Sequence, residues 1–376
     1  MSPLRVLNIY GTRPEAIKMA PVIKEFHARR EQFESFNCCT GQHLEMVRQV
    51  EAIFGITPDI ELNVMRPNQG LSGLTSRLIE QLGEVVRKLK PDWIIAQGDT
   101  TTVLASAIVA FYEGVQFGHV EAGLRTGDLQ RPFPEEFNRL VSDLVASLYF
   151  CPTERSADNL RAEGKREASI LVTGNTVIDA LQIAAEMEHD WASSPLASIG
   201  KSDPIVLITA HRRESFGETF AGICSAIRNL ADKFPYIQFV YPVHLNPNVQ
   251  APVNEILHAC DNVKLLPPLD YLSLIKLMKS ATLVLTDSGG IQEEAPGLGI
   301  PVVVMRETTE RPEGITAGVV KLAGTDPNSI VACVAGLLTN NAELQKMKSG
   351  ENPYGDGNAA IRIADAILAK GTQQPD

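Results

Sequence analysis

Three acidic side chains in the first half of the chain follow short apolar segments, at positions suited to acid–base chemistry. Asp99 follows WIIAQG, Glu121 follows FGHV, and Glu135 lies in RPFPEEFNR. Carboxylates gathered in one site can exchange protons with a substrate and stabilise positive charge that develops on it. Each acid also has a simpler explanation. Asp99 could cap a helix, and Glu135 could be a first-turn acid favoured by the helix dipole. Glu121 could form a structural ion pair with Arg125.

The second half contains the strongest local signal for a ligand, in the segment 286–294 (TDSGGIQEE). An apolar segment runs into Ser288, Gly289 and Gly290 and then into a predicted helix. Glycines let a phosphate approach the backbone, and N–H groups at a helix start donate to its oxygens. Glu294, about one turn into that helix, could accept both hydroxyls of a ribose. The pattern resembles the nucleotide-diphosphate pocket of GT-B glycosyltransferases and predicts a nucleotide-sugar binder.

Cationic side chains accompany these segments in both halves. Arg13 and Lys18 lie in GTRPEAIK, at the opening of a predicted helix, and can contact a diphosphate or the adjoining sugar. Two solvated surface cations are an equal alternative, and the missing GxGxxG fingerprint argues against a dinucleotide. His211 is followed by two arginines beyond a predicted strand, a pattern that favours an anion site.

The polar segments share a position, because each lies at the end of a predicted strand. Short β-rich segments alternate with helical patterns throughout, which is typical of βα units and parallel sheets. Ligands of open parallel sheets bind beyond the carboxyl ends of the strands, so we expect one cleft to collect these residues. The predicted strands are 4–10, 36–40, 93–97, 117–121, 148–151, 170–173, 204–209, 237–242, 263–266, 282–286, 301–305 and 319–322.

Length and composition favour two domains, because 376 residues exceed one typical core. The segment 191–203 is rich in Ser with Pro and Gly, and we interpret it as the region of the domain crossover. The predicted fold is α/β, with two Rossmann-like doubly wound domains and an interdomain cleft. We expect residues 1–185, completed by the C-terminal helix 356–376, to form the first domain and residues 186–355 the second.

Charge and composition exclude several classes of function. The formal net charge is −11, which argues against nonspecific binding to nucleic acid or to an anionic membrane. No segment approaches the roughly 20 apolar residues of a membrane-spanning helix, and the N-terminus does not resemble a signal peptide. The six cysteines lack zinc-site spacing. We therefore expect a cytoplasmic protein with no metal, membrane or nucleic-acid partner.

Taken together, the motifs resemble those of the non-hydrolysing UDP-N-acetylglucosamine 2-epimerases. The resemblance implies two Rossmann-like domains of GT-B type, a homodimer, and no cofactor. It also implies an isomerase that interconverts UDP-GlcNAc and UDP-ManNAc for bacterial surface polysaccharides. The similarity spans residues 11 to about 313 and runs in order through GTRPEAIKMAPVI, QGDTTT, HVEAGLRTGD, RPFPEEFNR, TGNTVIDAL, TAHRRESFG, YPVHLNPNV and TDSGGIQEEAPGLGIPVVVMRETTERPE.

The resemblance implies roles for individual residues, matched by position. The residues implicated in catalysis are Asp99, Glu121, Glu135 and His211, the last close to the diphosphate. The substrate-binding set is Arg13, Lys18, Leu269, Leu274, Ser288, Gly289, Gly290, Glu294 and Arg311, with the two leucines near the uracil. A second UDP-GlcNAc acting as an allosteric activator would contact Gln42, His43, Arg66, Gln69, Arg212 and His244.

The reaction expected of such an enzyme is elimination of UDP to give 2-acetamidoglucal, followed by re-addition with the opposite configuration at C2. Two other enzyme types fit the same motifs. A hydrolysing epimerase would release ManNAc and UDP, and a GT-B glycosyltransferase would use the same pocket with an acceptor. A nucleotide-sugar sensor without catalytic activity is a third alternative.

Overall fold

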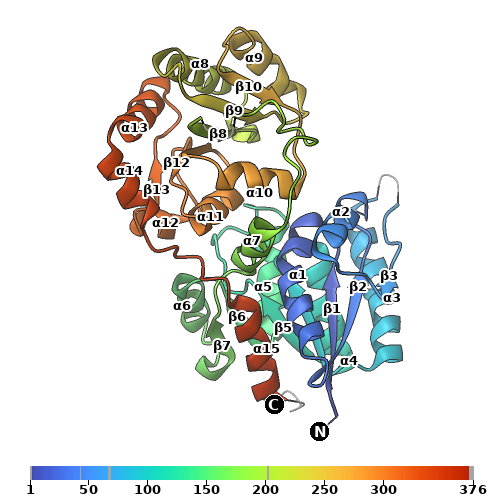
Figure 1. Cartoon of the computed structure of the whole chain (residues 1–376). Helices are drawn as coiled ribbons and strands as arrows, with labels where there is room; N and C mark the ends of the chain where they lie inside the picture. The colour runs from blue at the N-terminus through green and yellow to red at the C-terminus, as the bar shows by residue number, and fades with distance from the viewer. Residues whose placement is uncertain (1, 43, 67–68, 201–202, 372–376) are drawn as a thin grey trace. The chain divides into compact units, whose positions relative to one another are not determined.

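The computed structural model of the chain describes residues 2–42, 44–66, 69–200 and 203–371 (Figure 1). It separates into two compact units, Met1–Ala180 with Gly355–Asp376 and Leu181–Tyr354. The division falls inside α7 (Thr176–Glu186), ahead of the Ser-rich segment 191–203. The chain returns to the first unit at Gly355.

The first unit is built on a parallel sheet. Among its described residues, seven strands pair in the order β3-β2-β1-β4-β5-β6-β7. The order reverses between β1 and β4, and ligands of doubly wound sheets bind beyond the strand ends at such a point. The strands are β1 (Leu4–Tyr10), β2 (Phe33–Cys39), β3 (Ile60–Glu61), β4 (Trp93–Gln97), β5 (Gln116–Val120), β6 (Leu148–Cys151) and β7 (Ile170–Val172).

Helices pack on this sheet through apolar faces. One buried cluster joins Leu78 and Leu82 to Ile9 and Ile94 of the sheet, and burial of such side chains contributes about 1.5–3 kcal/mol each. The C-terminal helix packs beside α1, where Arg29 pairs with Asp365 at 2.5 Å (Figure 1). The helices are α1 (Arg13–Ala28), α2 (Leu44–Phe54), α3 (Leu71–Leu89), α4 (Thr101–Glu113), α5 (Glu135–Val145), α6 (Glu154–Ala162) and α15 (Ala359–Lys370).

The second unit repeats the architecture. In its described part, six parallel strands pair in the order β10-β9-β8-β11-β12-β13, with the reversal between β8 and β11. The strands are β8 (Ile205–Thr209), β9 (Gln238–Pro242), β10 (Val263–Leu266), β11 (Leu283–Thr286), β12 (Val302–Val304) and β13 (Val320–Leu322). The helices are α8 (Glu218–Lys233), α9 (Pro247–Leu257), α10 (Tyr271–Lys279), α11 (Gly289–Gly297), α12 (Pro312–Thr316), α13 (Pro327–Thr339) and α14 (Asn341–Lys348).

The two parallel sheets with alternating helices confirm the predicted α/β fold of two Rossmann-like units. Most predicted strand bounds agree with the structure to within one residue, and the differences at β2 and β5 have a physical reason. β2 begins at Phe33, whose buried ring packs on Phe26 at a centroid distance of 4.7 Å. β5 ends at Val120 because Glu121 adopts a positive φ, which breaks the extended conformation. In the described residues, no helix has both the length and the apolar content needed to cross a membrane.

Candidate functional site

The carboxyl ends of three neighbouring strands of the first sheet gather the predicted acidic segments. β1 pairs with β4 and β4 pairs with β5, all in parallel, so Tyr10, Gln97 and Val120 end their strands at one edge of the sheet. The segments that follow them carry Lys18, Asp99 and Glu121. These segments therefore follow neighbouring strand ends at one edge of this sheet. The prediction that one cleft collects the polar segments of both halves stays a prediction.

Glu121 is held at this edge by side chains from three other segments. The Lys18 ammonium donates to both carboxylate oxygens at 2.7 and 2.8 Å. Asn175 Nδ2 donates to Oε1 at 3.2 Å, and the Gln97 amide donates to Oε2. Glu121 is 9% exposed, and its φ of +68° is rare for a residue with a side chain. Such conformations persist where the surroundings enforce them, which is common in active sites.

The simpler explanation of Glu121, an ion pair with Arg125, is wrong. Arg125 Nη1 contacts Asp143 Oδ2 at 2.8 Å, and its Nε donates to Glu163 at 2.6 Å. The sequence could not reveal this, because both partners lie on other elements of the chain.

Asp99 lies in the turn between β4 and α4. Its carboxylate accepts from Arg139 Nη2 at 2.5 Å, and its backbone carbonyl accepts from Asn138 Nδ2 at 2.8 Å. The alternative that Asp99 caps α4 is wrong, since the cap is Thr100, which accepts from the Val103 N–H. The acid therefore remains available at the edge, facing a fixed cation on α5.

The two acids that begin α5 have different environments. Glu136 is 1% exposed and accepts from the N–H groups of Thr126 and Gly127 at 3.0 and 2.9 Å. It therefore fixes the loop that follows Glu121. Glu135 is partly exposed and makes no hydrogen bond or ion pair with any residue that the structure describes. Its carboxylate is free to meet a substrate.

The start of α1 differs from the expectation of an open anion site. The carboxylate of Glu15 accepts from the N–H groups of Gly11 and Thr12 at 2.9 and 2.6 Å. Burial raises the pKa of Glu15, although these hydrogen bonds and one from Thr100 oppose the shift. Two backbone donors ahead of this helix are thus already used, whereas the side chain of Arg13 is exposed.

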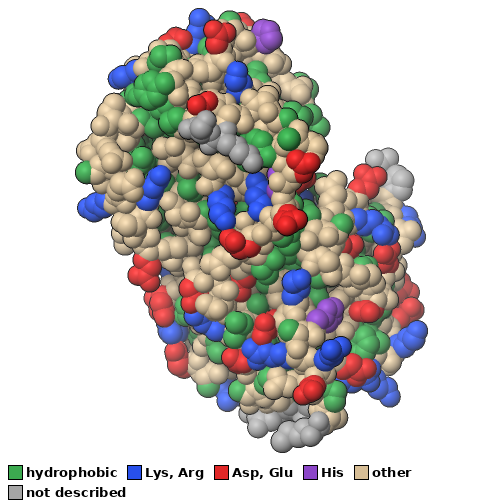
Figure 2. All heavy atoms as spheres, viewed as in Figure 1, with side chains coloured by type: hydrophobic (Ala, Val, Ile, Leu, Met, Phe, Trp, Pro, Cys, Tyr) green, Lys and Arg blue, Asp and Glu red, His purple; other side chains and the backbone are tan. Residues whose placement is uncertain are grey.

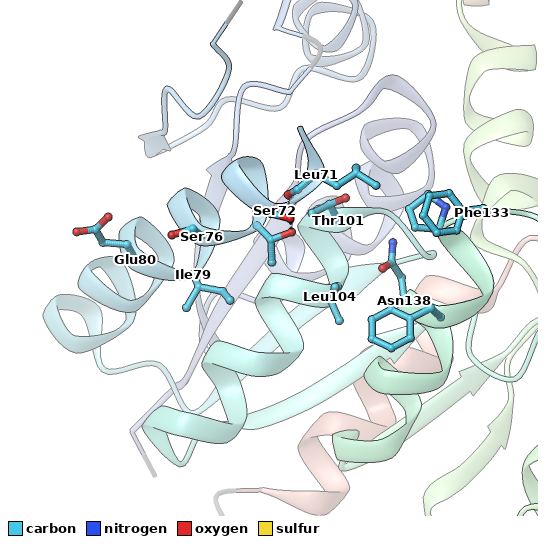
Figure 3. A pocket seen from close by; sticks show the side chains of 12 residues that line it. Leu71, Ser72, Ser76, Ile79, Glu80, Thr101, Leu104, Phe133 and Asn138 are labelled. Carbon is cyan, nitrogen blue, oxygen red and sulfur yellow. Dashed lines mark hydrogen bonds between the residues drawn. The ribbon is translucent and has the colours of Figure 1, made fainter. Parts of the chain in front are cut away.

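A groove of about 920 Å³ opens beside this edge. Its walls come from α3, α4 and the start of α5 (Figure 3). Leu71, Phe133 and Phe137 line it and are 43%, 62% and 48% exposed. Asn138 lines it too, and through its bond to the Asp99 carbonyl it joins the groove wall to the acidic edge.

In the second unit, the predicted glycine segment lies beyond β11, at the reversal point of that sheet. Ser288 is the N-cap residue of α11, and its N–H donates to the Thr286 hydroxyl at 2.9 Å. A Cβ added to Gly289 would lie 3.4 Å from the Arg212 guanidinium, whereas one added to Gly290 would meet nothing within 4 Å. The backbone at Gly290 is therefore open to an approaching group.

His211 and Asp287 meet at the same edge, after β8 and β11. Asp287 is fully buried, and its Oδ2 accepts from the N–H groups of His211 and Arg212 at 2.7 and 2.8 Å. Its Oδ1 lies 4.0 Å from His211 Nδ1 and has no described hydrogen-bond partner. The His211 ring stacks on His244 at 5.2 Å. Burial lowers the pKa of His211; Asp287 opposes this shift, and His244 and Arg212 add to it.

The remaining predicted substrate contacts of this unit follow β10, β11 and β12 in the chain. Arg311 forms an ion pair with the buried Glu293, which orients the guanidinium. Glu294 is partly exposed in α11. Leu269 and Leu274 are partly buried on either side of Asp270, which caps α10.

The predicted activator residues occur in both units. Gln42 accepts from the Thr102 hydroxyl at 3.2 Å, and the Arg66 N–H donates to Gln69 at 3.0 Å. Arg212 and His244 belong to the second unit, and His43 lies outside the described residues. The described residues contain no group of three or more His, Cys, Asp or Glu side chains placed to hold a metal ion.

Comparison with known proteins identifies the family. The family model for UDP-N-acetylglucosamine 2-epimerase matches residues 25–368. The chain belongs to the UDP-N-acetylglucosamine 2-epimerase family. It is 50% identical to the UDP-N-acetylglucosamine 2-epimerase of Escherichia coli O157:H7, over 97% of this chain and 98% of the relative. It is 45% identical to that of Bacillus subtilis, over 100% of this chain and 99% of the relative.

A solved structure supports the same conclusion. The UDP-GlcNAc 2-epimerase of Neisseria meningitidis bound to UDP-GlcNAc has a TM-score of 0.86 and 44% identity, over 97% of this chain and 100% of that one. The family resemblance of the motifs is thereby confirmed.

Proposed function

We propose that this chain epimerises UDP-N-acetylglucosamine reversibly at C2 to give UDP-N-acetylmannosamine, without net hydrolysis. The observation that carries the proposal is the edge of the first sheet, where Asp99 and Glu121 follow neighbouring strands. The helix that begins with Glu135 contacts this edge, because its Arg139 binds Asp99. Family membership supports the substrate, because the relatives carry the name of this activity. The product would supply precursors of bacterial surface polysaccharides, and we expect the reaction to occur in the cytoplasm.

The carboxylates solve a chemical problem at C2 of the sugar. The C2 hydrogen has no adjacent carbonyl to make it acidic, so it resists direct abstraction. When the C1–O bond breaks, its electron pair leaves with UDP and positive charge develops at C1. A carboxylate then takes the C2 proton, and the C2–H electrons form the double bond of 2-acetamidoglucal. A proton added to the opposite face of C2, with UDP oxygen returning to C1, gives the epimer.

The three acids share the acid–base chemistry in this scheme. Asp99, Glu121 and Glu135 exchange protons with C2 and stabilise the charge at C1. Asp99 and Glu121 already face fixed cations, Arg139 at 2.5 Å and Lys18 at 2.7 Å. Their geometry is therefore set before substrate arrives, which is the condition for effective electrostatic stabilisation.

The second unit holds the nucleotide in this proposal. N–H groups at Ser288, Gly289 and Gly290 donate to the diphosphate, and His211 stabilises it as it leaves. Glu294 accepts the ribose hydroxyls. The remaining substrate contacts are Arg13, Lys18 and Arg311 to the diphosphate or sugar, and Leu269 and Leu274 near the uracil.

The test is to incubate the protein with UDP-GlcNAc alone in D₂O and to follow the sugar signals by NMR. UDP-ManNAc should appear, with deuterium at C2 of both nucleotide sugars. Accumulation of free ManNAc and UDP would instead identify a hydrolysing epimerase. Absence of conversion and of deuterium exchange would refute the proposal and favour an acceptor-dependent glycosyltransferase.

The allosteric role belongs to the same proposal. A second UDP-GlcNAc would bind to Gln42, His43, Arg66, Gln69, Arg212 and His244 and activate the enzyme. Initial rates should then rise sigmoidally with UDP-GlcNAc concentration, and Arg66→Ala should make the curve hyperbolic. A hyperbolic curve for the unaltered protein would contradict activation.

We also propose that the enzyme is a homodimer and that the groove beside α5 contributes to its interface. Large exposed apolar side chains in one groove favour protein contact, and Leu71, Phe133 and Phe137 are such residues. Light scattering should give the mass of a dimer, and Leu71→Asp should shift it to a monomer. A monomer without any substitution would refute this.

A further inference from the structure

His119, which no part of the proposed reaction uses, lies buried directly below the acidic edge. It is on β5, has no exposed surface, and stacks on Phe117 at a centroid distance of 5.9 Å. Its Nδ1 lies 2.6 Å from Asp143 Oδ1 on α5. Its Nε2 lies 2.7 Å from the carbonyl oxygen of Gly98, the residue before Asp99. The ring therefore connects α5 to the turn that carries a proposed catalytic acid.

The partners of the ring determine its protonation. A neutral imidazole can donate from only one nitrogen, whereas an imidazolium donates from both. The Gly98 carbonyl can only accept. The other partner, Asp143, already accepts at Oδ2 from the Gly123 N–H at 3.1 Å and faces Arg125 at 2.8 Å, which is the pattern of a carboxylate. Both nitrogens of His119 thus face acceptors.

The electrostatic balance agrees with the geometry. Burial disfavours the charged ring, but the charge and hydrogen bond of Asp143, the Gly98 carbonyl and the charge of Asp99 raise the pKa of His119. Burial likewise disfavours the Asp143 carboxylate, and His119 and Arg125 nevertheless lower its pKa. The charged groups that face the ring are therefore Asp143 on α5 and Asp99 in the turn after β4.

We propose that His119 is a positioning residue for the epimerisation, held as a permanent imidazolium between Asp143 and the Gly98 carbonyl. Through Nε2 it fixes the turn that presents Asp99. Through Asp143, which also binds the Gly123 N–H and Arg125, it fixes the segment that follows Glu121. Because Asp143 lies on α5, the helix that begins with Glu135, one buried ion pair ties together all three acid-bearing segments. This inference rests on the proposed roles of those acids.

The inference has a spectroscopic test that does not depend on activity. In protein labelled with ¹⁵N-histidine, the His119 signals are identified by their loss in His119→Gln. Both ring nitrogens should keep the ¹⁵N chemical shifts of an imidazolium from about pH 6 to about pH 8.5. An ordinary histidine loses its proton within this pH range. A neutral tautomer at about pH 7.5 would overturn the proposal, whether or not the enzyme epimerises.

Kinetics separate a positioning role from a merely structural one. His119→Gln keeps a donor but loses the charge, so kcat should fall about 10²-fold while the Kd of UDP stays within about twofold. The matched control is Tyr149→Phe, which removes a buried hydrogen bond from the same region, to the Asp143 carbonyl at 3.0 Å. It should leave kcat within about threefold of the unaltered enzyme. Equal loss in both variants, or normal kcat in His119→Gln, would contradict the proposal.

Discussion

The carboxyl edges of the two sheets differ in how far their polar groups are already satisfied. In the first unit, Glu121 and Asp99 are bound to Lys18 and Arg139, and backbone donors are used by Glu15 and Glu136. In the second unit, Gly290 is open and one oxygen of buried Asp287 lacks a described partner. Acids already paired with cations suit chemistry on a bound sugar, while the open helix start at Gly290 suits an anion.

The viewed surface shows why net charge says little about this difference. In Figure 2, acidic and basic side chains intermingle over both units, although the formal net charge is −11. Function depends on the few charges held in place at the strand ends.

The largest expected effect is a fall in kcat when an acid at the edge of the first sheet is neutralised. Glu121→Gln should lower kcat by about 10²-fold or more, because proton transfer is lost and Lys18 is left without its anion. Asp99→Asn and Glu135→Gln should act in the same direction. The Kd of UDP, measured by calorimetry, should change little, since the proposal assigns the nucleotide to the second edge.

The control is Glu163→Gln, which alters an ion pair of Arg125 at 2.6 Å without touching the edge. It should keep near-normal turnover. If all three acid variants turned over normally, the first edge would not be the site of chemistry.

A smaller effect, on the Kd of UDP, is expected at Gly290 in the second unit. In Gly290→Ala, the new methyl group meets no atom of the protein within 4 Å, so folding should be unaffected. It would occupy the space needed by the diphosphate, and the Kd of UDP should rise about tenfold or more.

Gly336→Ala in α13 is matched, because its Cβ also meets nothing within 4 Å. This change should leave UDP binding as it is. Equal UDP affinity in Gly290→Ala and the unaltered protein would place the diphosphate elsewhere.

The smallest expected effect is a pH dependence from His211. Because its pKa is lowered in the free protein, the ring is neutral near pH 7, and stability from this group is lost only as pH falls through the lowered value. A bound diphosphate would favour the imidazolium and raise the pKa. Affinity for UDP-GlcNAc should therefore strengthen by about 3- to 10-fold between about pH 8 and pH 6.

His211→Gln should flatten this profile while keeping some binding. A slope of the same size in His211→Gln would assign the titration to another group, such as the stacked His244.

The sequence predicted the fold, with polar segments at its strand ends, because strand periodicity and strand-end position are local properties. It could not predict which partner each acid takes. Arg125 was the near neighbour of Glu121 in sequence, but Lys18 binds it from α1. Similarly, α4 is capped by Thr100 and not by Asp99, a choice set by backbone geometry at the turn.

Other features depend on tertiary packing and left little trace in the sequence. His119 stood within a recognised motif, yet its role follows from Asp143 on a helix that packs against the strand. Glu136 repeats the residue type of Glu135. Only the fold distinguishes the buried Glu136, which fixes a loop, from the partly exposed Glu135.

The proposal assigns the chemistry to the edge of the first sheet and the nucleotide to the edge of the second. A crystal structure of Glu121→Gln with UDP-GlcNAc tests it most directly. The diphosphate should lie within hydrogen-bond distance of the N–H groups at Ser288–Gly290. Sugar C2 should lie within about 4 Å of a side-chain oxygen at position 99, 121 or 135, close enough for proton transfer. A nucleotide bound away from Ser288–Gly290, or a sugar about 10 Å or more from all three side chains, would contradict the account.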